Sequence, residues 1–247
     1  MKNNDTRDFF KSGAFITGIC LIVSSVIFSA AFYSSRLSSD SISVTGSASK
    51  QVVSDSAKFS GNFSRIVKLS NLKSGYTQMS SDLKIMKDFF KSQKIEDKDI
   101  TISTVSMEQN YDYNQSGVSA TEKDYTLRQN IEIFSSDVAK IGALAQATQS
   151  IINKGVIFSV NPVEYYYTNL PQVRVDLLAD AVKDAQARAK KLIESTGKTL
   201  GSLKSASSGV VQVLPANSLE ISDYGTYDTS KVNKNIMVTA KVSFEIK

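Results

Sequence analysis

The feature that most constrains this chain is an uncharged apolar segment at residues 13–33, which reads GAFITGICLIVSSVIFSAAFY. At about 1.5 Å rise per residue, a helix of this length spans the roughly 30 Å hydrocarbon core of a bilayer. We therefore predict a transmembrane anchor, or an uncleaved signal, at 13–33. A cytoplasmic tail at 1–12 precedes it, a polar linker at 34–41 follows it, and one domain occupies 42–247.

Basic residues flank this segment unequally. Lys2, Arg7 and Lys11 precede it, and Arg36 follows it. An excess of positive charge before a membrane helix favours a cytoplasmic N-terminus. We therefore expect a single-pass protein of the inner membrane, with its C-terminal domain on the periplasmic, extracytoplasmic side.

Cleavage of the segment is the alternative to anchoring. Ser29, Ala30 and Ala31 are small enough to form a cleavage site. The apolar region of a cleavable signal is typically 7–15 residues, shorter than this one, which favours the anchor. Both alternatives export the residues from about 40 onward.

Composition excludes several kinds of chemistry. The chain has no His and one Cys, Cys20, which lies inside the apolar segment. The exported part therefore has no thiol, no intramolecular disulfide, no Ser-His-Asp triad and no imidazole metal ligand. The net charge is +5 without a concentrated basic block, so we expect no nucleic-acid partner. We also expect no cofactor, no metal site and no catalytic residues.

Hydrophobic periodicity predicts an α+β domain. Period-two alternation indicates strands, and apolar residues three and four apart indicate helices. The elements expected, in order, are a strand at 57–69, a helix at 72–90, a strand at 100–107, a hairpin loop at 108–122, a strand at 125–133, a helix at 138–152 and a strand at 156–160. This β-α-β-β-α-β order is typical of a ferredoxin-like core.

The remaining elements predict a second lobe. It contains a strand at 42–46 ended by Gly46, a long Ala-rich helix after Pro171, and antiparallel strands at 203–214 and 236–246. The helix has an apolar stripe that starts at Val175. Ala181, Ala185 and Ala189 form a small-residue ridge within it, which permits close approach to a neighbouring element.

Three stretches resemble the SIMPL-domain (DUF541) family in order and spacing. They are RVDLLADAVKDAQARAKKLIESTGKTLG at 174–201, ISVTGSASKQVVSDSAKFS at 42–60 and KIEDKDITIST at 94–104. Two positions depart from the family pattern: Ser54 replaces the usual Pro, and Lys94 replaces a frequent Gly. Both departures change turn chemistry and indicate a divergent member.

The resemblance implies a bacterial envelope or periplasmic α/β protein without agreed catalytic residues. Family members are often connected with oxidative-stress or outer-membrane roles, and one similar periplasmic antigen assembles into a large ring. Without an exported thiol, a stress role here would act through envelope integrity or a partner.

We therefore expect a non-enzymatic envelope protein, anchored by its N-terminal helix, that forms a homo-oligomer or binds an envelope protein through sheet edges and loops. Tyrosines predicted at loops and strand ends are the candidate interaction residues, because tyrosine joins an apolar ring to a polar tip. They are Tyr111, Tyr113, Tyr165, Tyr166, Tyr167, Tyr224 and Tyr227. The plainer interpretation is that these tyrosines form a packed rim of the domain.

The alternative function is an envelope hydrolase or a glycan-binding module. A glycosidase needs two carboxylates about 5 Å apart, or somewhat more in inverting enzymes. The carboxylates available for that role are Asp55, Glu108, Asp112, Glu132 and Glu164. The seven candidate tyrosines would then stack on sugar rings.

Overall fold

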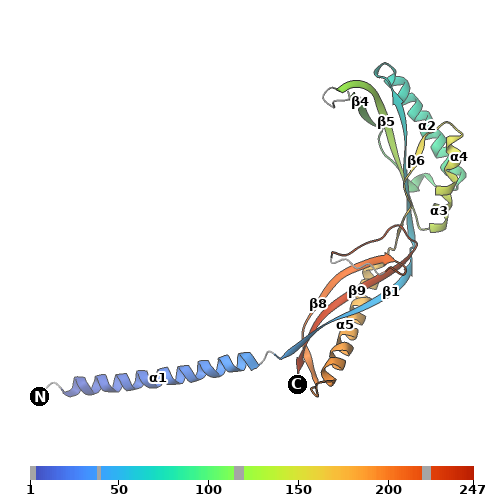
Figure 1. The fold of residues 1–247 in the computed structure, drawn as a ribbon. Helices are drawn as coiled ribbons and strands as arrows, with labels where there is room; N and C mark the ends of the chain where they lie inside the picture. Colours follow the sequence, from blue (N-terminus) through green and yellow to red (C-terminus); the bar gives the residue numbers. More distant parts are fainter. Residues whose placement is uncertain (1–3, 38–39, 114–119, 219–223) are drawn as a thin grey trace. The chain divides into compact units, whose positions relative to one another are not determined.

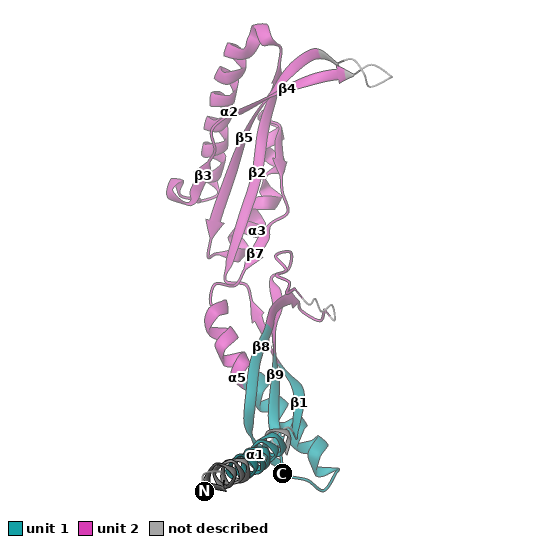
Figure 2. Ribbon diagram, turned by 90° about the vertical axis from the view of Figure 1, so that its left-hand side faces the viewer, with its two compact units in different colours: residues 1–47, 180–209, 240–247 teal, residues 48–179, 210–239 magenta. Residues whose placement is uncertain are grey.

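The structure is a computed structural model that describes residues 4–37, 40–113, 120–218 and 224–247. The chain divides into two compact units (Figure 2). Unit 1 comprises 1–47, 180–209 and 240–247, and unit 2 comprises 48–179 and 210–239. The predicted α+β class is confirmed: an N-terminal apolar helix precedes antiparallel sheets.

The first helix, α1, runs from Asn4–Leu37 (Figure 1). Within it, Ile16–Ser34 is long and apolar enough to cross a membrane, and none of its side chains is buried by the rest of the protein. This segment has the properties of a membrane anchor or a signal sequence.

Unit 2 is built on a six-stranded sheet in the order β3-β5-β2-β6. Its long central strands are β2 (Ser56–Val67) and β5 (Ala120–Ser135), paired antiparallel. The flanking strands are β3 (Ile100–Ile102) and β4 (Ser106–Tyr113) on β5, and β6 (Phe158–Val160) and β7 (Glu164–Tyr166) on β2. The helices are α2 (Leu72–Ser92), α3 (Val138–Ala147) and α4 (Gln149–Ile152), with 3₁₀ turns at Leu69–Asn71 and Asp97–Asp99. This order and pairing are those of the predicted ferredoxin-like core.

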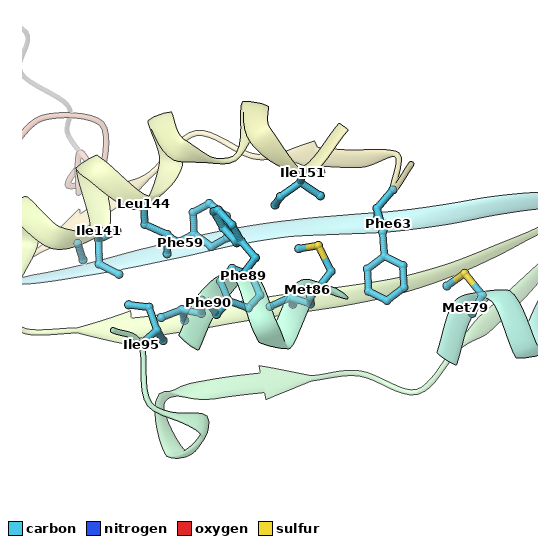
Figure 3. Close-up of a cluster of buried hydrophobic side chains, with 14 of the residues drawn as sticks. Phe59, Phe63, Met79, Met86, Phe89, Phe90, Ile95, Ile141, Leu144 and Ile151 are labelled. Atoms are coloured by element: carbon cyan, nitrogen blue, oxygen red, sulfur yellow. The ribbon is translucent and has the colours of Figure 1, made fainter. Parts of the chain in front are cut away.

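The core of unit 2 lies between this sheet and its helices. Phe59 and Phe63 of β2 are fully buried, and their alternation is the one that the sequence predicts. Figure 3 shows them among α2 side chains such as Met86 and Phe90. Residues with even numbers on β2 lie on the opposite face of the sheet, and apart from Ser60 they are only partly buried or exposed. We call this the uncovered face.

Two expected boundaries in unit 2 are wrong. The strand expected at 100–107 is two strands, β3 and β4, separated by three residues. The loop expected at 108–122 is largely strand, because β4 continues to Tyr113 and β5 begins at Ala120. The polar sequence SMEQNYDY lacks β-branched residues, and it is the pairing with β5 that holds it extended.

A second sheet has the order β1-β9-β8, with β1 at Ser41–Val53, β9 at Asn233–Ile246 and β8 at Leu200–Pro215. The helix α5 occupies Leu170–Glu194. These elements each contribute residues to both units. In unit 2, Val173 and Leu177 of α5 are buried with Val213, Ile236 and Val238.

In unit 1, the predicted alanine ridge is confirmed, since Ala181, Ala185 and Ala189 are all fully buried. The strand does not end at Gly46 as expected. It continues to Val53, and Gly46 lies against α5, where an added Cβ would be 2.1 Å from the Ala181 carbonyl oxygen. The expected start of the apolar stripe is also wrong, because Val175 is mostly exposed.

Candidate interaction site

Strand β7 places two site residues on the uncovered face of the unit 2 sheet. Its register with β2 pairs Glu164 with Lys58 and Tyr166 with Ser56. The Lys58 ammonium lies 2.7 Å from the Glu164 carboxylate. The Tyr166 hydroxyl donates a hydrogen bond to the same carboxylate. Lysine, glutamate and tyrosine therefore form one hydrogen-bonded cluster.

This cluster shifts the pKa of its members in the directions expected for charge-assisted hydrogen bonds. Hydrogen bonds from Lys58 and Tyr166 lower the pKa of Glu164. The bond to Glu164 raises the pKa of Lys58 and that of Tyr166. At neutral pH the cluster holds a carboxylate, an ammonium and a neutral phenol.

Tyr166 of this cluster lies between two further aromatic rings. The register of β2 with β5 pairs Lys58 with Phe134, whose ring centroid is 6.4 Å from that of Tyr166. The Tyr227 ring lies 6.2 Å beyond Tyr166. We call Phe134, Tyr166 and Tyr227 the aromatic row. Phe134 is half exposed and Tyr227 is also exposed, so part of the row faces solvent.

The segment that carries Tyr227 is fixed at several points. Its hydroxyl accepts a hydrogen bond from the Tyr167 backbone N–H at 3.0 Å. The next residue, Asp228, donates its own N–H to the Val213 carbonyl at 2.8 Å. Tyr227 is therefore held between β7 and β8.

A buried lysine contacts the same segment. The Lys234 side chain is completely buried, and its ammonium lies 5.7 Å from the centre of the Tyr227 ring. The ammonium donates to the Asp228 carbonyl and lies 3.8 Å from the Asp228 carboxylate. Burial lowers the pKa of Lys234, although Asp228 opposes that effect.

The seven candidate tyrosines divide into separate environments. Tyr166 and Tyr227 meet in the aromatic row, whereas Tyr165 packs against the hydrophobic core and Tyr167 against the smaller core beside α5. Tyr224 is almost fully exposed. Tyr165 and Tyr167 are therefore packed side chains of unit 2.

Tyr111 lies at the other end of the sheet. It pairs with Glu122 on β5, beyond the pairing of Tyr125 with Val67. Lys58 and Val67 are nine positions apart on β2, which separates the two ends by roughly 30 Å. Tyr113 is in β4 by its backbone, and its side chain lies outside the described residues.

The carboxylates of the alternative function do not all meet, although the charges of Glu132 and Glu164 both act on Lys58. Asp55 accepts hydrogen bonds from the backbone N–H and hydroxyl of Thr168, both at 2.8 Å, and so has a structural role. Asp112 pairs with Lys123 on the β4–β5 hairpin. Among the described residues there is no group of three His, Cys, Asp or Glu side chains suited to a metal.

The second sheet has an exposed outer strand. All residues from Ser202 to Ser208 of β8 are exposed, although alternate residues of a strand on a packed sheet are normally buried. In the part of the chain that the structure describes, no strand pairs with the outer side of β8 here. We call Leu200 to Gly209 the free edge.

Sequence reasoning missed Phe134 and Lys234. Alternation put Lys58 on the polar face, but only the register across β2 and β5 brings Phe134 beside it. Lys234 precedes the alternating run of β9 and has the appearance of a solvated lysine. No local signal marks either residue.

Comparisons with known proteins agree with the family resemblance. The family model described as SIMPL, protein of unknown function (DUF541), matches residues 42–246. No curated protein matches the chain. Among solved structures, the B. subtilis GlnK–ATP complex is 13% identical and matches 42% of this chain and 83% of that chain at a TM-score of 0.20, a likeness too weak to carry an argument. Since the family model covers most of the sequence, the chain belongs to the SIMPL family.

Proposed function

We propose that this SIMPL protein is held in the inner membrane by α1, presents its domain to the periplasm, and acts there without catalysis by assembling with further copies of itself. The free edge carries this proposal. On its outer side an edge strand has backbone N–H and C=O groups that another strand can bond.

The composition of the edge supports pairing. Proteins usually protect edge strands with charges or proline. The free edge reads LGSLKSASSG and has one charge, at Lys204. The other outer strand, β1, has no charged residue between Ser41 and Ser49. Both strands are rich in serine, and Lys204 is the one charge in these two stretches that could oppose pairing with a second copy.

The strand directions support a head-to-tail contact. The Ile246 N–H donates to the Asp40 carbonyl, and Thr199 exchanges hydrogen bonds with Lys247, so β1 and β8 both begin where β9 ends. They therefore run parallel to each other. Pairing β8 of one copy with β1 of the next is a heterologous contact, which closes into a ring when the rotation permits.

Native mass spectrometry of the full chain released from detergent micelles tests assembly. We expect a discrete multimer. Ser205→Lys with Ser207→Lys places two charges on the free edge and should give monomer. Ser74→Lys with Ser81→Lys adds the same charge on the exposed surface of α2 and should leave the multimer intact. A monomeric wild-type protein at high concentration would sink the proposal.

Glycan binding is the second candidate, and the aromatic row is the observation that favours it. Exposed rings suit stacking on sugars, and the adjacent Lys58 and Glu164 side chains suit hydroxyl groups. Calorimetric titration of envelope glycan fragments would decide, since Phe134→Ala should then weaken binding while Tyr111→Ala does not. Unchanged heats for both variants would remove this candidate.

A further inference from the structure

A surface hollow lies at the end of unit 1 where α5 finishes and β8 begins. Its volume is about 330 Å³, and its lining includes Gln186, Lys190, Glu194, Lys198 and Thr199. The start of β1 is at the same end, because Lys198 lies 3.7 Å from the Asp40 carboxylate. Figure 1 shows the last residues of β9 there too.

The chain itself limits the distance of this hollow from a membrane. The membrane-crossing segment ends at Ser34, and Asp40 follows six residues later. Six residues span at most about 21 Å when fully extended. The headgroup layer on each side of a bilayer occupies roughly 5–8 Å of that distance. If α1 is in the membrane, the hollow is within reach of lipid headgroups.

The two lysines of the hollow have only loose ion-pair partners. Lys190 is 3.9 Å from Glu194 and Lys198 is 3.7 Å from Asp40, and all four side chains are more than half exposed. Exposed pairs at such distances are strongly screened by water. Both ammonium groups can therefore leave these carboxylates and bind another anion.

The surroundings of the hollow suit a lipid surface. Lys191 and Lys247 are further exposed bases of unit 1. Leu192 is exposed between Lys191 and the buried Ile193. Basic side chains beside an exposed leucine are the combination that holds proteins at the interface of anionic bilayers.

We propose that this hollow, with Lys190 and Lys198, binds the headgroup of an anionic phospholipid in the bilayer that holds α1. The phosphate accepts hydrogen bonds from the two ammonium groups, and Thr199 also lines the hollow. Binding holds the end of unit 1 that contains the hollow against the membrane surface. The inference rests on the membrane anchoring proposed above and is independent of self-assembly.

Lysines near a helix C-terminus have a simpler explanation, because they stabilise the helix dipole. That role depends neither on lipid nor on the hollow. The two explanations therefore differ in their response to lipid composition.

The test uses the full chain in nanodiscs of phosphatidylcholine with or without 30% phosphatidylglycerol. A fluorophore on Ser195→Cys, in a Cys20→Ser background, reports proximity to headgroup-attached quenchers. We expect quenching only with phosphatidylglycerol, and its decline as salt is raised. Lys190→Glu with Lys198→Glu should lower the docked-to-undocked ratio at least about 25-fold, at roughly fivefold per lysine. Lys73→Glu with Lys87→Glu on α2 should leave it unchanged.

Each contrary outcome has a distinct meaning. Quenching that is equal in both lipids, or equal in both double variants, overturns the headgroup site while anchoring stands. Failure of the full chain to co-elute with nanodiscs overturns the anchoring, and the headgroup site with it.

Discussion

The backbone N–H of Tyr167 donates to the hydroxyl of Tyr227 at 3.0 Å, across 60 residues of sequence. This bond joins the strand that supplies Tyr166 to the segment that completes the aromatic row. The aromatic row therefore depends on a contact between two distant parts of the chain. Removal of the Tyr227 hydroxyl oxygen should disturb the geometry of the row.

Tyr227→Phe keeps the ring and removes that acceptor. We expect a loss of about 0.5–1 kcal/mol in the free energy of unfolding, since the site is partly exposed and water replaces the bond. Chemical denaturation followed by circular dichroism measures it. Tyr76→Phe, on the exposed surface of α2, is the matched control, and a larger loss there would contradict the assignment.

Gly46→Ala tests the close approach of β1 and α5. The new Cβ would lie 2.1 Å from the Ala181 carbonyl oxygen and 2.4 Å from the Ala185 nitrogen. Both are backbone atoms, so the helix must move, at a cost of about 1–3 kcal/mol. Gly142→Ala in α3 meets nothing within 4 Å and should stabilise by about 0.5–1 kcal/mol. Thermal unfolding of both variants checks the contrast, and equal effects would refute the explanation.

The sequence predicts the core better than the boundaries, for a physical reason. Phe59 and Phe63 alternate within one strand, so local periodicity reveals their burial. Gly46 is misread as a strand end, because the helix that requires a glycine is more than 130 residues away. In the same way, Tyr166 and Tyr227 are too far apart in the sequence for local periodicity to connect them. Register across strands decides the candidate site, and register depends on the whole sheet.

Lys94 departs from the family pattern at a position where the backbone favours glycine. Its φ is +60°, in the left-handed region. A side chain there costs about 1–2 kcal/mol, while glycine makes the unfolded chain more flexible. We expect Lys94→Gly to raise the free energy of unfolding by about 0.5–1 kcal/mol. Gly155→Ala is the reverse experiment, with φ of +78° and open space around it, and should cost about 1 kcal/mol.

Ser54 also departs from the family pattern, and its two polar groups differ. Its backbone N–H donates to the Val232 carbonyl at 2.8 Å, whereas its hydroxyl is the one buried polar side-chain group among the described residues that has no hydrogen-bond partner. Ser54→Ala should therefore be neutral or stabilise by up to about 1 kcal/mol. Ser54→Pro, the family's usual residue, should destabilise because it removes the N–H donor. Denaturant midpoints that rank proline above alanine would contradict this account.

Glu164 should make stability depend on acid pH. Hydrogen bonds from Lys58 and Tyr166 lower its pKa in the folded protein below the ordinary value of 4.5. A lowered folded pKa means that the contribution of the carboxylate is fully present above about pH 4.5. It is lost as the pH falls through the folded pKa.

The difference in melting temperature between wild type and Glu164→Gln should therefore be constant near neutral pH and shrink below pH 4.5. A difference in melting temperature that stays constant down to about pH 3 would contradict this account.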